Sequence, residues 1–199
     1  MSSCKLSISV CTSASSANVQ GLIDEMRSRF RDIVADVDYF KLPYNDIDKF
    51  SVADSGIDVM LLCHSIHNRR FAITDVTDAL YQKFLPKAAR VVGKSRVGVI
   101  VHDMPKDKFD RPDVYAREMN VFRRQQPKTF KNSALAMIAG KLDFKPVEII
   151  PDDWARLEGF VREASLHSRQ QTERGNNKSL DRQCLIVTLA LIVTALVLV

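Results

Sequence analysis

Residues 57–65 read IDVMLLCHS, and residues 96–103 read RVGVIVHD. Each stretch is an almost unbroken apolar run, short enough for a strand and followed directly by polar residues. A strand whose side chains are nearly all apolar is buried on both faces, which is typical of the centre of a parallel sheet. The two stretches therefore predict an α/β protein with helices on both faces of its sheet.

The chain before these two strands continues the alternation. Residues 5–11 and 36–42 are strand candidates. Between them, the apolar side chains of residues 19–33 recur at helical spacing, and Ser15 or Ser16 is a natural N-cap for that helix. The first half of the chain is therefore expected to form a βαβ unit that leads into the strand at residues 57–65.

The second half is expected to add two strands and three helices. The expected elements are a helix over residues 73–85 that Pro86 kinks or ends, the strand at 96–103, a helix over 129–142, a strand over 145–150 and a helix over 151–165. The complete order predicts a single, three-layer, doubly wound and mostly parallel five-stranded sheet with the flavodoxin-like strand order 2-1-3-4-5. Rossmann-type strand orders are the alternative.

Bulk composition excludes several classes of protein. The 199 residues allow one domain and a tail, and a net charge of +5 is not a strong nucleic-acid signal. The four cysteines, at positions 4, 11, 63 and 184, have no metal-site spacing, so no metal centre is expected. Cys11 and Cys63 lie in apolar runs and are expected to be buried, as in a protein of a reducing compartment.

The last residues, 184–199, read CLIVTLALIVTALVLV and carry no charged side chain. As a helix they would span about 24 Å, which suits a thin bilayer such as that of the endoplasmic reticulum. Basic residues precede this stretch and none follows, so a cytosolic body is expected. The alternatives are a buried C-terminal helix or a GPI signal, and the latter needs an export signal that the N-terminus lacks.

The expected organisation is therefore a cytosolic α/β domain (1–165), a polar basic linker (166–183) and a transmembrane tail anchor (184–199). The membrane partner would be bound through residues 185–199, at the endoplasmic reticulum in preference to the mitochondrial outer membrane. Cys184 stands at the expected membrane boundary and is a candidate lipidation site.

Ligands of open α/β sheets bind beyond the carboxyl ends of the strands. In the order 2-1-3-4-5 the first, third and fourth strands are neighbours, so their polar ends are expected to meet. There, serine hydroxyls at a helix N-terminus and two arginines suit a phosphorylated ligand, and His64 could transfer protons with Asp103 or His102 orienting it. The candidate ligand-binding residues are Thr12, Ser13, Ser15, Ser16, His64, Ser65, Asn68, Arg69, Arg70, His102 and Asp103. The alternative is that these are ordinary loop and capping residues, and no catalytic residue is assigned.

Two resemblances to known families bear on this edge. TSASSAN, at residues 12–18, resembles the hydroxyl-rich phosphate loop of flavodoxins but lacks their Thr-Gly pair. VMLLCHS resembles the caspase strand that carries the catalytic histidine, which would place His64 there, and residues 92–105 resemble the strand that carries the cysteine. This chain has VHDMP where caspases have Q-A-C-x-G, so the resemblance implies no protease activity. Neither resemblance assigns a family.

A basic stretch, residues 117–141, contains six Lys or Arg residues interleaved with Phe122 and Phe130. It is either a face for acidic lipids or an acidic partner, or a solvated surface whose two Phe side chains pack inward. The second interpretation is favoured, because a charge run usually only solubilises its helix.

These observations favour a tail-anchored membrane protein whose domain is a non-enzymatic interaction or signalling module with protein partners. No cofactor is required by this interpretation. The alternatives are an enzyme or sensor of a phosphorylated small molecule, such as a nucleotide or flavin, and a caspase-like or hydrolase-like pseudoenzyme.

Overall fold

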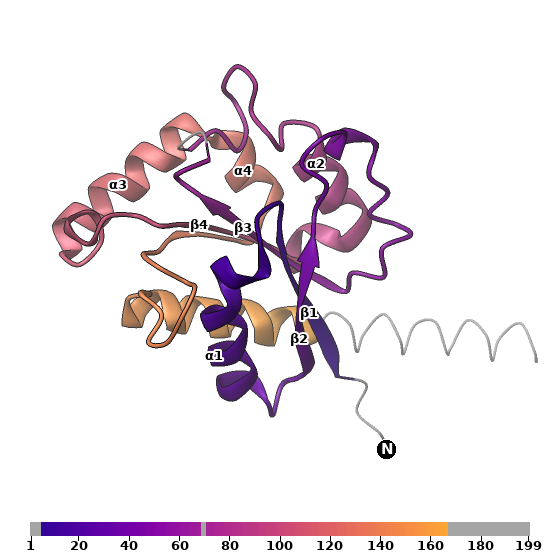
Figure 1. Cartoon of the computed structure of the whole chain (residues 1–199), viewed down its shortest axis with the longest axis horizontal. Coiled ribbons are helices and arrows are strands. Elements are labelled where there is room, and N and C mark those ends of the chain that lie inside the picture. The colour runs from indigo at the N-terminus through magenta and orange to yellow at the C-terminus, as the bar shows by residue number, and fades with distance from the viewer. Residues whose placement is uncertain (1–4, 69–70, 167–199) are drawn as a thin grey trace, which may run out of the picture. The chain divides into compact units, whose positions relative to one another are not determined.

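The computed structural model describes residues 5–68 and 71–166. Its sheet has five parallel strands in the order β2-β1-β3-β4-β5 (Figure 1). This confirms the α/β class and the flavodoxin-like strand order predicted from the sequence. The strands are β1 (Leu6–Thr12), β2 (Val34–Lys41), β3 (Val59–Ser65), β4 (Val97–His102) and β5 (Leu135–Ile138).

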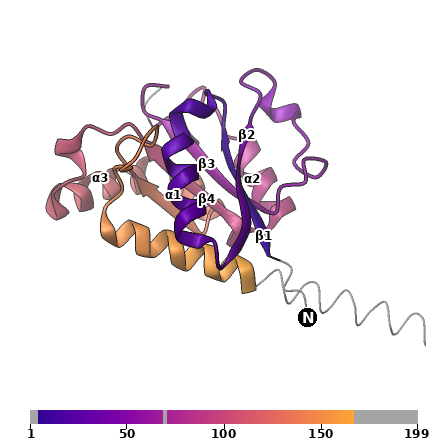
Figure 2. The same cartoon turned by 60° about the horizontal axis from the view of Figure 1, so that its bottom comes forward.

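Helices cover both faces of the sheet (Figures 1 and 2). One face carries α1 (Gln20–Phe30) and the last helix, whose described part is residues 151–166; the other carries α2 (Phe84–Ala88), α3 (Pro112–Gln125) and α4 (Pro127–Asn132). The short turns are η1 (Ser16–Val19), η2 (Ile47–Lys49), η3 (Ala89–Gly93), η4 (Lys94–Arg96) and η5 (Lys106–Lys108).

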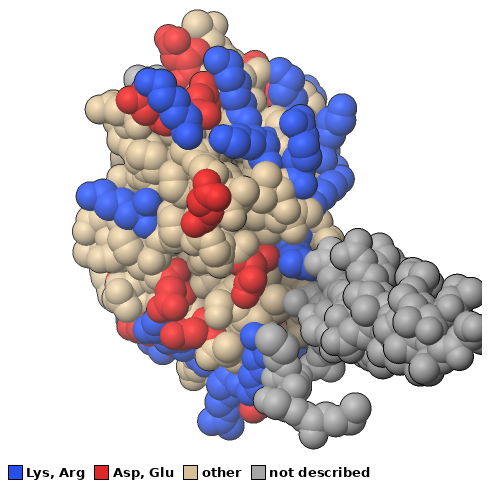
Figure 3. All heavy atoms as spheres, turned by 90° about the vertical axis from the view of Figure 1, so that its right-hand side faces the viewer, with Lys and Arg blue, Asp and Glu red and all other residues tan. Residues whose placement is uncertain are grey.

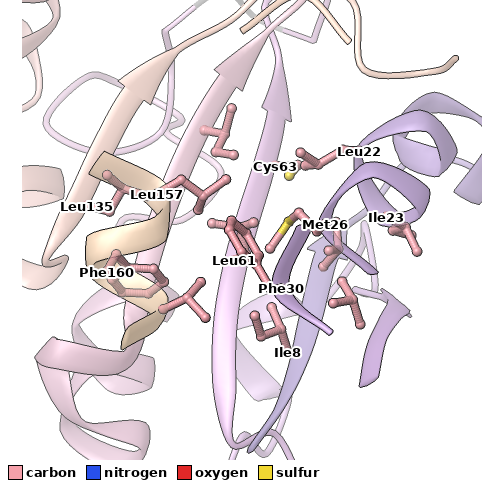
Figure 4. Packing of buried hydrophobic residues seen from close by; sticks show 14 of the residues in the cluster. Ile8, Leu22, Ile23, Met26, Phe30, Leu61, Cys63, Leu135, Leu157 and Phe160 are labelled. Carbon is pink, nitrogen blue, oxygen red and sulfur yellow. The ribbon is translucent and has the colours of Figure 1, made fainter. Parts of the chain in front are cut away.

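The alternation of side chains along the strands produces two separate cores. In β3, Leu61 and Cys63 point to the α1 face and Leu62 points to the α2 face. Figure 4 shows side chains of α1 and of the last helix converging on the core at the α1 face of the sheet. The prediction that Cys11 and Cys63 are buried is confirmed, and burial raises the pKa of both thiols.

Close packing of the last helix on β4 depends on the absence of a side chain at Gly98. A Cβ atom there would lie 2.8 Å from Cδ1 of Leu61 and 3.4 Å from the ring of Phe160. The ring of Phe160 therefore lies beside the first residues of β4, and the helix ends beyond that level. The helix therefore runs, up to Ser165, toward the amino edge of the sheet, the edge at which the strands begin.

The predicted identity of the fifth strand was wrong, although its place in the strand order was right. β5 is Leu135–Ile138, inside the stretch predicted to be helical, whereas residues 145–150 form no strand. Four apolar residues in a row suit either element, and only pairing decides between them. Ile100 of β4 lies beside Met137, and all four side chains of β5 are buried between the two helical layers.

The predicted helix over residues 73–85 is also wrong. Asp75 and Asp78 have left-handed backbone angles, with φ of 60° and 59°, which an α-helix cannot accommodate. Helix α2 starts only at Phe84 and carries Pro86 in its first turn, where a missing N–H costs nothing. Conversely, Pro112 starts α3 between the strand predicted at 96–103 and the helix predicted over 129–142, where no element was predicted.

No helix within the described ranges is long and apolar enough to cross a membrane. The expected anchor at residues 184–199, its candidate lipidation site Cys184 and nearly all of the expected linker lie outside those ranges.

A buried carboxylate joins the two helical layers beside β5. The side chain of Asp153 is 1 % exposed; it accepts hydrogen bonds from the Tyr115 hydroxyl of α3 and, at 2.5 Å, from the guanidinium of Arg156. Arg156 also donates to the carbonyl of Ala136 in β5, at 3.0 Å. Burial raises the pKa of Asp153, although the tyrosine and arginine partly counteract the effect.

We expect Tyr115→Phe to lower the free energy of unfolding by about 1–3 kcal/mol at neutral pH, because it leaves a buried carboxylate short of a donor. The loss should shrink in acid, because a protonated Asp153 needs less stabilisation. Urea denaturation at both pH values measures this. Tyr44→Phe is the control, because Tyr44 is 49 % exposed. Equal losses in the two variants would show that the buried hydrogen bond contributes nothing.

Candidate functional site

The carboxyl ends of β1, β3 and β4 lie side by side, as the strand order requires. Cys11 pairs with Leu62, and Ser65 pairs with His102. The polar residues that follow each strand therefore occupy one edge of the sheet, which we call the carboxyl edge. The structure thus brings most of the predicted ligand-binding residues to one place; Arg69 and Arg70 lie outside the described residues.

A contact between Ser65 and Asp103 lies at the centre of this edge. The Ser65 hydroxyl donates to Oδ2 of Asp103 at 2.5 Å and accepts from the N–H of His67 at 3.2 Å. Asp103 has a left-handed φ of 65°, and its own N–H donates to the carbonyl of Gly140. The carboxylate is therefore held by its backbone as well as by its side-chain partner.

His102 lies beneath this carboxylate and is completely buried. Its Nδ1 lies 3.1 Å from Oδ2 of Asp103, but neither ring nitrogen makes a hydrogen bond of good geometry within the described part of the chain. The pair is therefore an electrostatic contact rather than a directed hydrogen bond. Burial alone would raise the pKa of Asp103; the His102 and Ser65 side chains outweigh burial and lower that pKa, so the carboxylate is ionised at neutral pH.

His64 is not part of this cluster, contrary to the expectation that Asp103 or His102 would orient it. Adjacent residues of a strand point to opposite faces of a sheet. Ser65 shares its face with His102, so His64 points to the α2 face, where it is 2 % exposed and lies edge-on to the ring of Tyr81 at 5.7 Å. His64 therefore lies on the opposite face of the sheet from Ser65 and His102.

The order of contacts at the carboxyl edge differs from that of a nucleophilic site. An activated serine donates to an imidazole, which a carboxylate then orients. Here Ser65 donates directly to Oδ2 of Asp103, and the imidazole of His102 contacts that same oxygen instead of accepting from the serine. An ionised carboxylate with a lowered pKa is a weak base, so this cluster is better suited to holding two loops together than to proton transfer.

The hydroxyl groups after β1 mostly make local bonds. Thr12 accepts from the N–H of Ala14 at 3.2 Å, and Ser15 caps η1 by accepting from the N–H of Ala17 at 3.4 Å. Ser15 therefore caps the short η1 that precedes α1, whereas the N-cap position of α1 itself is Val19, which makes no side-chain capping bond. Ser13 lies close enough to Tyr81 to affect the pKa of that phenol, which burial raises. Two further predicted ligand-binding residues are Ser16, the first residue of η1, and Asn68, in the turn after β3.

The N-terminus of α1, where an anion was expected to bind, is occupied by another part of the chain. The N–H of Gly21 donates to the carbonyl of Asp143, and the N–H of Leu22 donates to that of Leu142, both at 3.0 Å. These carbonyls belong to residues 139–148, which we call the cover loop. Carbonyl oxygens thus take the place that phosphate oxygens occupy at comparable helix N-termini.

The cover loop is anchored at several points. The Leu142 side chain is completely buried in the core beneath α1. At the base of the loop, Gly140 donates to the carbonyl of Glu148 at 2.8 Å, and Lys141 donates to the Glu148 carboxylate at 2.8 Å. A Cβ atom at Gly21 would lie 2.6 Å from the backbone of Phe144, so the loop also touches α1. It is therefore an integral part of this edge.

An open hollow of about 760 Å³ lies beside the same edge, between the segments that follow β3 and β4. Apolar side chains line most of it, among them Ile66, Phe71 and Met104, and the ion pair Lys108–Glu118 stands at its rim. No group of three or more His, Cys, Asp or Glu side chains within the described ranges is arranged to hold a metal ion.

The interleaved phenylalanines of the basic stretch pack inward, as the favoured interpretation predicted. Phe122 is completely buried and Phe130 is partly buried against the same core. The guanidinium of Arg123 lies over the Phe130 ring, 4.6 Å from its centroid. Arg117 and Arg124 remain exposed on α3.

The residues that the sequence interpretation missed all belong to the cover loop and its contact with α1. Its chain, GKLDFKP at residues 140–146, begins with Gly and ends with Pro and contains an Asp, which is a loop composition. That signal was present but was assigned to a helix end and the start of a strand.

We expect Gly21→Ala to displace the cover loop, because the new methyl group would overlap the backbone of Phe144. Thermal denaturation should show a lower melting temperature, and hydrogen exchange should be faster in residues 141–147. Gly159→Ala is the matched control, because no atom lies within 4 Å of its Cβ position and alanine favours a helix by about 1 kcal/mol. An unchanged exchange rate in Gly21→Ala would contradict the proposed role of this contact.

We expect Ser65→Ala to raise the pKa of Asp103 and to lower the unfolding free energy by about 1–2 kcal/mol at neutral pH. A carboxyl whose folded-state pKa is lowered contributes stability above its unfolded pKa and loses it as pH falls through the folded pKa. The difference from the parent protein should therefore vanish in acid. Ser55→Ala, which removes a bond to the Val52 carbonyl, should show no such pH dependence in denaturant titrations.

Comparisons with protein-family models, with curated proteins and with solved structures found no match to this chain. The assignment to the α/β class therefore rests on the strand order and pairing of the chain itself.

Proposed function

We propose that this chain is a tail-anchored membrane protein whose α/β domain is a non-enzymatic interaction or signalling module. One observation carries the non-enzymatic part. The helix N-terminus that would bind an anion in this kind of sheet already donates to the carbonyls of Leu142 and Asp143. A ligand that bound there would have to displace the cover loop, which is anchored in the core. The protein would then lose those two hydrogen bonds.

The electrostatics of the carboxyl edge favour the same proposal. The carboxylate of Asp103 is ionised at neutral pH and lies among the residues that would surround a ligand. A phosphate group would be repelled by that charge at close range. A sensor of a phosphorylated small molecule, such as a nucleotide or flavin, is therefore the weaker alternative. The caspase-like or hydrolase-like pseudoenzyme is weaker too, because His64 is buried against Tyr81.

The membrane part of the proposal rests on the sequence of residues 184–199 and on the basic residues that precede them. The sixteen apolar residues would span about 24 Å as a helix, less than a bilayer core of about 30 Å. A short span suits the thinner membrane of the endoplasmic reticulum, which we propose as the location in preference to the mitochondrial outer membrane. The domain would then meet its protein partners on the cytosolic surface.

We expect the full chain to stay in the membrane pellet after alkaline carbonate extraction, and a chain that ends at residue 183 to be released. The matched control replaces only Thr188 and Thr194 with valine, which keeps the segment apolar and should not release the protein. Release of the full chain by carbonate would contradict the anchor.

The non-enzymatic part has its own test, native mass spectrometry of the full chain purified from cells in mild detergent. An apo mass is expected. A retained nucleotide, flavin or phosphate ester whose binding is lost in Ser15→Ala would favour the sensor instead.

A further inference from the structure

Two segments of this domain that lie side by side carry cations but no acidic residue. Residues 79–102 contain five Lys or Arg residues and residues 119–142 contain another five, and neither segment has an Asp or Glu. The first segment includes α2 and β4, and the second includes α4 and β5. Helix α2 packs against α4, and the N–H of Ala134 donates to the carbonyl of Val97 at 2.9 Å. Two acid-free stretches are thus joined into one surface.

Three exposed cations of this surface lie close to the amino edge of the sheet. Arg90 in η3 and Lys94 in η4 precede the first residue of β4, and Lys131 in α4 precedes β5. None of the three makes an ion pair within the described part of the chain, whereas Lys83 and Lys128, nearby, pair with Asp48 and Asp75. We call Arg90, Lys94 and Lys131 the basic surface. Figure 3 shows the side of the molecule that lies on the right in Figure 1, and Lys and Arg are gathered over the upper part of that side.

An apolar side chain is exposed at the same edge. Val91, next to Arg90 in η3, is 46 % exposed. Cations flanking an exposed aliphatic side chain are the combination that favours the headgroup region of a bilayer.

We propose that the basic surface docks the domain, amino edge first, on the anionic lipid headgroups of the membrane that holds its tail. This inference rests on the tail anchor proposed above. The surface charges then select the face that meets the membrane, and the carboxyl edge with the cover loop points to the cytosol.

The expected size of the effect follows from the field of an anionic leaflet. Each basic residue near such a surface increases the ratio of docked to undocked protein by about fivefold. The double variant R90E/K94E removes two cations, so this ratio should fall by about 25-fold or more. Added salt should have a similar effect, because the screening length shrinks from about 10 Å at 0.1 M to about 3 Å at 1 M.

The experiment uses the full chain reconstituted into bilayers of phosphatidylcholine alone or with about 30 % phosphatidylserine. Hydrogen–deuterium exchange is measured in peptides covering residues 84–96 and 127–134. We expect slower exchange only with phosphatidylserine, and loss of that protection in R90E/K94E and at high salt. The matched control, K106E/R117E, makes the same change in net charge at exposed positions away from the basic surface and should stay protected.

Carbonate extraction of the same bilayers separates failure of this inference from failure of the anchor. A chain that resists extraction but exchanges equally with both lipids overturns lipid docking and leaves the anchor intact. A control variant that loses protection as fully as R90E/K94E also overturns it, because net charge alone would then suffice. If carbonate extracts the chain, the proposed anchor is wrong, and vesicle flotation then tests lipid docking on its own. Binding to phosphatidylserine vesicles that R90E/K94E abolishes and K106E/R117E retains would support docking through the basic surface. Absence of binding would overturn it.

Discussion

Two hydrogen bonds at the first turn of α1 determine what the carboxyl edge of this domain can do. The N–H groups of Gly21 and Leu22 lie in the first turn of α1, where N–H groups without a partner inside the helix can bind an anion, and both are directed at carbonyls of the cover loop. The close approach depends on Gly21, because any side chain there would overlap the backbone of Phe144. The loop is held from the other side by the burial of Leu142. Helix, loop and core therefore support one another.

The pleat of the sheet divides the polar residues of this edge into two groups that do not communicate directly. Ser65, His102 and Asp103 lie toward the α1 layer, where the carboxylate joins the segments after β3 and β4. His64 lies toward the α2 layer, packed against Tyr81. His64 and Ser65 are neighbours in the sequence, but adjacent residues of a strand point to opposite faces of the sheet. His64 is therefore separated from Ser65, His102 and Asp103, although the sequence suggests that the four could act together. The polar groups that remain together stabilise loops.

The two ends of the sheet differ in their chemistry. The carboxyl edge carries hydroxyls, a buried imidazole and an ionised carboxylate, most of them with partners in the fold. The amino edge carries Arg90, Lys94 and Lys131, which make no ion pair in the described part of the chain, together with the exposed side chain of Val91. Most polar groups of the carboxyl edge are hydrogen-bonded within the fold, whereas the three cations of the amino edge make no ion pair in the described part of the chain. This difference favours a domain that docks on a charged surface over one that binds a small molecule.

Apolar periodicity alone determined the class of this protein. Strands β3 and β4 could be predicted because each apolar run has the length of a strand and is followed directly by polar residues, which is typical of a strand buried on both faces. The strand order followed from the alternation of elements, and it held even though the fifth strand was assigned to residues 145–150 and not to β5. A four-residue apolar run fits a helix or a strand equally well, and only its pairing with β4 selects between them.

What only the tertiary structure decided depends on contacts between residues far apart in the chain. Local sequence does not show that Asp75 and Asp78 take left-handed backbone angles, or that the cover loop reaches α1 from more than a hundred residues away. The sequence alone placed the hydroxyls, histidines and Asp103 at one edge, because the carboxyl ends of parallel strands must meet there. Which of them face one another, and that the anion position is already filled, depended on strand register and on the packing of a loop, and neither leaves a local pattern in the sequence.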